Sequence, residues 1–185
     1  MRWAALFADL EAQYASTDHL TLESEVAERA RMDQSALTLN ERLRGQTGAM
    51  LKVRTSSDET FEGLLTHVGT EWVVLHSGRR SVLVPLHSAV LFHGLGRATA
   101  TASSTIESKL RLTSALRALS RDRAALTIHL PCGGASGALH GIIDRVGSDF
   151  IEVALIPRGE YRRAGSVVEV VALPLQSIIA VVSQQ

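Results

Sequence analysis

The chain has 185 residues, of which 45% are hydrophobic and 21% are charged, with 19 basic and 19 acidic side chains. This composition is typical of a globular protein with one or two domains, and the balanced charge argues against a protein held on nucleic acid by charge alone. No apolar run reaches the roughly 18 residues that span a bilayer, and the N-terminus lacks the pattern of a secretory signal. Cys132 is the single cysteine, which excludes an intrachain disulfide, so we expect a cytoplasmic protein without membrane contact.

The N-terminal segment, 1–44, shows helical periodicity. A first helix is predicted because five apolar residues fall on one helical face, namely Trp3, Leu6, Phe7, Leu10 and Tyr14. A second helix is predicted from about Leu22 to Arg44, with Gly45 as its C-cap. These helices form a hairpin or cover the first β unit, and they are a candidate surface for a protein partner.

The main feature of the sequence is an internal duplication. The segment 63–75, GLLTHVGTEWVVL, recurs as 141–153, GIIDRVGSDFIEV, at a constant offset of 78 residues. A second pair follows, Pro85-Leu86-His87-Ser88 and Pro174-Leu175-Gln176-Ser177. A repeat of this kind indicates two copies of one structural unit.

Alternating apolar residues predict five strands in each copy. In the first copy (45–93) they lie near 49–54, 60–68, 71–76, 81–85 and 88–92, and in the second near 125–130, 137–146, 149–156, 166–173 and 177–182. Gly69 and Gly147 are interpreted as the first central residues of type II′ turns. Gly63 and Gly141, inside strands, predict a bulge or sharp bend.

A linker, 94–105, separates the copies and is small, polar and without periodicity. Ser104 and Glu107 have capping-box spacing, which predicts a linker helix from there to about Ser120. The second predicted domain, 106–185, thus comprises this helix and a second sheet. The predicted fold class is β-dominated α+β, with N-terminal helices and two tandem five-stranded small barrels joined by a linker helix.

This order of elements, with a helix, five bent strands and a glycine in strand two, resembles the Sm-like fold, and SH3-like small barrels remain an alternative. The whole chain also resembles a group of uncharacterised actinobacterial proteins that are sometimes labelled Fis-type regulators. No helix-turn-helix pattern supports that label. The Sm-like resemblance implies association with RNA and assembly of several copies through strand edges.

The residues of the Sm-like RNA pocket are not retained. That pocket uses an aspartate and an asparagine after the strand-two glycine, where this chain has Thr70 and Val73 in one copy and Ser148 and Ile151 in the other. Aromatic residues follow instead, Trp72 and Phe150. They either stack on nucleic-acid bases or, the alternative we favour, plug the ends of the β units.

Basic side chains are concentrated in two places. The linker helix and its exit carry Lys109, Arg111, Arg117, Arg121 and Arg123, and a long hairpin of the second copy carries Arg158, Tyr161, Arg162 and Arg163. If they converge on one face they form a phosphate-binding stripe, and if they scatter they are ordinary solvated surface.

No group of residues has the spacing of a metal site or of a nucleophile with its base, so we expect no metal, no cofactor and no enzymatic activity. The first functional hypothesis is a nucleic-acid-associated binding module, more for RNA than for DNA, that uses these basic residues. The alternative is an interaction or assembly protein that uses its helices and strand edges without nucleic acid. Small units with open edges also predict a homo-oligomer or a tightly packed pseudo-dimer.

Overall fold

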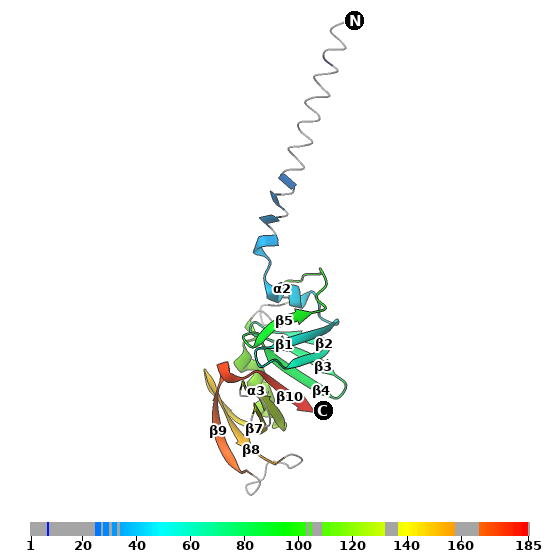
Figure 1. The fold of residues 1–185 in the computed structure, drawn as a ribbon. Coiled ribbons are helices and arrows are strands. Elements are labelled where there is room, and N and C mark those ends of the chain that lie inside the picture. Colours follow the sequence, from blue (N-terminus) through cyan, green and yellow to red (C-terminus); the bar gives the residue numbers. More distant parts are fainter. Residues whose placement is uncertain are drawn as a thin grey trace. The chain divides into compact units, whose positions relative to one another are not determined.

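The computed structural model (Figure 1) describes residues 34–102, 104, 109–131, 137–157 and 167–184, together with 7, 25, 26, 28, 29, 31 and 32. The chain divides into two compact units, Met1–Thr38 and Leu39–Gln185. The boundary differs from the predicted one at residue 44, because Leu43 is fully buried in the core of the second unit.

In the first unit, the described residues up to 36 are helical. The predicted helix from Leu22 to Arg44 does not run through, because Leu37 and Thr38 are not helical and helix α2 starts afresh at Leu39–Arg44. Thr38 and Glu41 have the spacing of a capping box, which favours a new helix start at this point.

The second unit contains one antiparallel sheet of ten strands among the described residues. The first five are β1 (Met50–Thr55), β2 (Thr60–Val68), β3 (Trp72–Ser77), β4 (Arg80–Pro85) and β5 (Ala89–His93). The second five are β6 (Leu126–His129), β7 (Ala138–Val146), β8 (Phe150–Leu155), β9 (Glu169–Pro174) and β10 (Ala180–Gln184). We call β1–β5 the first half and β6–β10 the second half.

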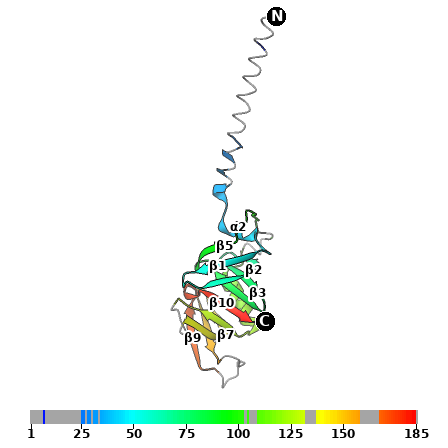
Figure 2. The same cartoon turned by 45° about the vertical axis from the view of Figure 1, so that its right-hand side comes forward.

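The two predicted five-stranded groups are joined edge to edge. The strand order is β5-β1-β2-β3-β4-β10-β6-β7-β8-β9, so β4 of the first half pairs with β10 of the second. The sheet formed by the described strands does not close on itself, and β5 and β9 lie at its two ends (Figure 2). The described strands therefore form one continuous open sheet, and the two tandem small barrels stay a prediction.

Corresponding strands of the two halves pair in the same register. On β2 and β7, Leu65 pairs with Leu75 and Ile143 pairs with Val153. Each ladder then shifts by one residue, between Leu65 and His67 and between Ile143 and Arg145. The bulges therefore lie at Thr66 and Asp144, not at the glycines.

Gly63 and Gly141 have a role that was not predicted. A Cβ atom at Gly63 would lie 2.7 Å from the backbone oxygen of His76, and one at Gly141 would overlap the backbone oxygen of Ala154. These positions are glycine because the neighbouring strand approaches closely, which any side chain would prevent.

The segment that was predicted as a linker packs on α2. The backbone oxygens of Gly96 and Ala98 accept bonds from the side chains of Arg42 and Gln46, at 2.7 and 3.0 Å. Gly45 follows α2 but lacks the positive φ of a glycine C-cap; a Cβ there would overlap Ala98. This part of the linker is thus a strap, and Gly45 lets it approach.

Helix α3 (Leu112–Asp122) starts later than the predicted capping box at Ser104, and its N-cap, Arg111, makes no side-chain cap bond. Glu107 lies outside the described residues. The helix ends at Arg123, which adopts the left-handed conformation with φ 48°. Its first turn is capped instead by a residue of the first half, as described below.

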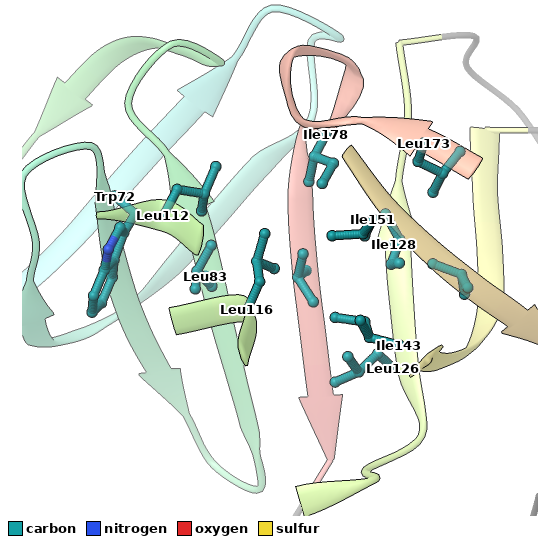
Figure 3. Packing of buried hydrophobic residues seen from close by; sticks show 12 residues of the cluster. Trp72, Leu83, Leu112, Leu116, Leu126, Ile128, Ile143, Ile151, Leu173 and Ile178 are labelled. Atoms are coloured by element: carbon teal, nitrogen blue, oxygen red, sulfur yellow. The ribbon is translucent and has the colours of Figure 1, made fainter. Parts of the chain in front are cut away.

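The core of the second unit joins its two halves. One cluster combines Leu43 of α2 and residues of the first half such as Leu51 and Leu75 with Ala180 of β10. The other combines Trp72 and Leu83 of the first half with residues of the second half such as Ile143. Figure 3 shows Leu112 and Leu116 of α3 among these side chains, so α3 packs against both halves. In the described part of the chain, no helix combines the length and apolarity needed to cross a membrane.

Candidate binding cleft and open sheet edges

The turn between β2 and β3 is shaped by an aromatic ring. A Cβ atom at Gly69 would overlap the indole of Trp72, and one at Gly147 would overlap the ring of Phe150. Neither glycine has the positive φ that a type II′ turn requires, so that prediction is wrong. The glycines are needed because each ring lies across its own turn.

The turn of the first half anchors the segment before α3. The backbone oxygen of Leu110 accepts bonds from the Trp72 indole Nε1–H (3.1 Å), the Thr70 hydroxyl (3.0 Å) and the Thr70 backbone N–H (3.1 Å). Trp72 is only 7% exposed. Its ring is therefore packed and hydrogen-bonded, which removes it as a stacking platform for bases.

Glu71 caps α3 from 41 positions earlier in the chain. Its Oε2 accepts the Leu112 backbone N–H at 3.2 Å, and its Oε1 lies 3.8 Å from Nε of Arg111. A carboxylate at a helix N-terminus satisfies a free N–H group and interacts favourably with the helix dipole. The capping role of Glu71 was not predicted from the sequence.

A cleft of about 1190 Å³ lies where the turns of the two halves meet. Its walls come from equivalent positions of the duplication and from the first turns of α3. Thr70, Glu71, Leu86 and His87 of the first half correspond to Ser148, Asp149, Leu175 and Gln176 of the second. The cleft is thus built from both copies.

The cleft is mixed in charge. Arg111 and Arg117 line it, and so do Glu71 and Asp149. Arg111 is engaged by Glu71, while Arg117 has no carboxylate partner within the described ranges. The charges balance, which suits a polar ligand or a partner surface better than a polyanion alone.

Part of the predicted basic cluster comes together here. Arg111 and Arg117 share the cleft, Arg121 lies one helical turn beyond Arg117, and all three are exposed. Lys109 and Arg123 are exposed but do not line the cleft. The predicted residues Arg158, Tyr161, Arg162 and Arg163 lie outside the described residues. Phe150 is half-buried against its own turn.

The junction of β4 and β10, which we call the internal seam, is reinforced by side chains. The buried hydroxyl of Ser88 lies 2.8 Å from the Pro85 oxygen and 2.7 Å from the Ile179 oxygen. Nε2 of His87 lies 3.1 Å from the Ile178 oxygen. His87 and Ser88 belong to the second repeated segment, so this segment joins the first half to the second.

A second group of contacts joins the halves on β6. Nδ1 of His129 lies 2.8 Å from Oε2 of Glu59, and the ring of Phe61 meets the imidazole edge-on with centroids 5.5 Å apart. Sequence reasoning assigned His129 no role, because these contacts arise only from pairing across the seam.

The two ends of the sheet are apolar and open. Val90 and Leu91 on β5 are exposed, as are Val170 on β9 and Val168 just before it. Within the described residues, no group of three or more histidine, cysteine or acidic side chains is placed to bind a metal. The sequence matches no protein-family model, and no curated protein matches it significantly.

Proposed function

We propose that this protein is a non-enzymatic assembly module whose working surfaces are the open edges of its sheet. The observation that carries this proposal is the internal seam. There β4, an edge strand of the first half, pairs with β10, an edge strand of the second half. Edge strands present unpaired backbone N–H and C=O groups, and a partner strand that binds them gains main-chain hydrogen bonds.

Each half is proposed to be a small unit of Sm-like or SH3-like type. The support is the shared order of five strands, in which the fifth strand of each half pairs with the first, and the identical register of the two halves. The Sm-like identity rests on this likeness of pattern, since the residues of the family's RNA pocket are not retained.

A peptide tests the function directly. The segment 178–184, IIAVVSQ, contains β10, which occupies the edge of β4 in the folded chain. Because β9 is the counterpart of β4, we expect a labelled peptide of this sequence to bind the free β9 edge saturably, as measured by fluorescence anisotropy. A scrambled peptide is the control. Val170→Lys should weaken binding, because it replaces an apolar side chain that is 53% exposed on β9 with a charged one.

Equal binding of both peptides, or none, would reject the sheet edge as a binding surface. The protein partner that the N-terminal helices were expected to recruit remains a proposal. Its test is deletion of residues 1–38 with measurement of assembly state. Deletion of 1–44 would also remove Leu43 from the core.

A second candidate function is the binding of single-stranded nucleic acid, more RNA than DNA. The observation that favours it is the exposed pair Arg117 and Arg121 on α3, beside a cleft that Arg111 also lines. Cationic side chains along a groove are the common means of holding a phosphate backbone. The long hairpin with Arg158, Tyr161, Arg162 and Arg163 remains a candidate part of the same surface.

A further inference from the structure

The turn between β7 and β8 is a structural copy of the turn between β2 and β3. In each turn the glycine N–H bonds to the oxygen of the aromatic residue three positions later, at 2.8 Å from Gly69 and 2.9 Å from Gly147. The backbone oxygen of the acidic residue, Glu71 or Asp149, accepts a leucine N–H at 2.8 Å in both halves. The two turns therefore share one backbone frame.

The first of these turns holds another segment of the chain. The backbone oxygen of Leu110 accepts three hydrogen bonds from Thr70 and Trp72. Glu71 accepts the first backbone N–H of α3 and lies beside the guanidinium of Arg111, whose backbone is extended. The occupant of this turn is therefore a leucine-arginine-leucine segment, 110–112, that begins a helix.

The second turn carries equivalent groups, and no described segment occupies it in this way. Ser148 supplies the N–H and the hydroxyl that correspond to those of Thr70, and Asp149 supplies the carboxylate that corresponds to that of Glu71. In the described part of the chain, the Ser148 hydroxyl bonds to the neighbouring Asp149 carboxylate, at 3.2 Å, and the carboxylate has no cationic partner. These groups are therefore open to a ligand.

Burial differs between the two turns in the same sense. Trp72 is buried and its counterpart Phe150 is half-buried, while Pro85 is buried and its counterpart Pro174 is exposed. Pro174 and Leu175 line the cleft. The second turn thus offers an apolar surface, next to its polar groups, that the first turn keeps covered.

We propose that the Ser148–Asp149 turn binds a segment of a partner protein in which a basic residue stands between two apolar residues at the start of a helix. Ser148 donates hydrogen bonds to a backbone oxygen of this segment. Asp149 accepts the first helical N–H and pairs with the basic side chain. A carboxylate in this position is favoured both by the free N–H groups of a helix N-terminus and by the helix dipole.

The cleft has the room and the charges for such a segment. Its volume of about 1190 Å³ exceeds the roughly 300–1,000 Å³ of pockets that hold small molecules. Arg111 is engaged by Glu71, whereas Arg117 has no carboxylate partner within the described ranges. Arg117 therefore favours an acidic residue in the first helical turn of the partner, where acidic residues also interact well with the helix dipole.

The second turn has one donor fewer than the first. Phe150 has no N–H group at the place where Trp72 donates to Leu110. The segment that fills the first turn also belongs to the same chain, which gives it a high effective concentration that a separate chain lacks. We therefore expect a reversible contact at the second turn and a permanent one at the first.

A labelled peptide of residues 109–120, KLRLTSALRALS, is the probe, because it contains the segment that fills the first turn. It should bind the full chain saturably, as measured by fluorescence anisotropy, and a scrambled peptide of the same charge should not. Asp149→Ala should weaken binding about tenfold, since a charged acceptor is lost. The matched control Glu169→Ala removes the same charge from β9 outside the cleft and should leave binding unchanged.

Two further variants test the copied geometry by a gain of affinity. Phe150→Trp supplies the missing N–H donor and should tighten binding about two- to tenfold, the usual effect of one hydrogen bond. Asp149→Glu reproduces the acidic residue of the first turn and should bind at least as well as the unaltered chain. A merely structural role of these residues would produce no tighter complex.

The preference for an acidic residue has its own test. A peptide with Thr113→Glu should bind more tightly than the parent peptide, and Arg117→Ala in the protein should abolish this gain. A gain that persists in Arg117→Ala would reject Arg117 as the partner of the acidic residue.

The proposal is independent of the sheet edges, and its failure is distinguishable from theirs. Binding of the 109–120 peptide that survives Asp149→Ala, or equal binding of its scrambled form, would overturn the site. An unlabelled 178–184 peptide should not displace the probe. Displacement would assign the probe to the sheet edge and would also overturn the proposal.

Discussion

Trp72 lies across the backbone of Gly69, three residues earlier, and its indole N–H donates to the Leu110 oxygen at 3.1 Å. This relationship fixes the turn and the entry to α3 together. The second half repeats the ring and the glycine, as Phe150 and Gly147, but Phe150 has no N–H group to donate. The two turns are therefore alike in shape, but only the ring of the first turn holds the segment before α3 through a hydrogen bond.

The first prediction concerns these glycines. Gly69→Ala should lower the free energy of unfolding by about 1–3 kcal/mol, because the added methyl group overlaps a ring that is buried and cannot move without losing its hydrogen bond. Gly147→Ala is the matched variant and should cost less, because Phe150 is only half-buried and can turn away. Chemical denaturation of both variants measures the difference. An equal loss of stability would contradict the distinct role of Trp72.

The second prediction concerns the remote cap of α3. Glu71→Ala should destabilise the protein by about 0.5–2 kcal/mol, the usual effect of removing a side chain that caps a helix. Glu71→Gln keeps an oxygen acceptor for the Leu112 N–H and should cost less. Amide hydrogen exchange should speed up in the first turn of α3 in Glu71→Ala and not in strands β1 and β2. Unchanged exchange in α3 would show that the cap contributes nothing.

The strand boundaries were largely predictable from sequence, and the seam was not. Alternation placed the second strand at 60–68, where β2 lies, and the third at 71–76, one residue from β3. Such local patterns reflect one buried face. The pairing of β4 with β10 depends on groups about 100 residues apart, Val82 and Val182 for example, and no local pattern specifies it.

At the candidate site, too, local features were predictable from the sequence and contacts between the halves were not. The repeat drew attention to Pro85-Leu86-His87-Ser88, but it could not show that Ser88 reaches Ile179, since that contact exists only after the halves join. The type II′ interpretation of Gly69 failed for a related reason. Glycine was read as a sign of positive φ, whereas the constraint is the ring of Trp72.

The third prediction compares two equivalent serines. Ser88→Ala should reduce stability by about 1–3 kcal/mol, because a buried carbonyl at the seam loses its partner. Ser177→Ala should change the stability of an isolated chain by less than about 0.5 kcal/mol, as expected for a site away from the seam. If the β9 edge accepts a partner strand, Ser177→Ala should instead weaken binding of the 178–184 peptide, measured by fluorescence anisotropy. An equal effect of both serines on the isolated chain would contradict this division.

The last prediction tests the nucleic-acid candidate. If the α3 surface binds RNA, retention of a mixed-sequence single strand should fall steeply with salt, since the logarithm of affinity decreases by about 0.7 per phosphate contact for each tenfold rise in salt. Arg117→Glu with Arg121→Glu should remove most of this binding, because both side chains are exposed and neither forms an ion pair in the described part of the chain. Arg29→Glu with Arg31→Glu makes the same change of charge in the helical first unit and is the matched control.

Arg162→Glu with Arg163→Glu tests the long hairpin in the same way. Equal losses in the α3 variant and the control would mean that net charge alone holds the RNA, and absence of binding at low salt would leave the sheet edges as the functional surface.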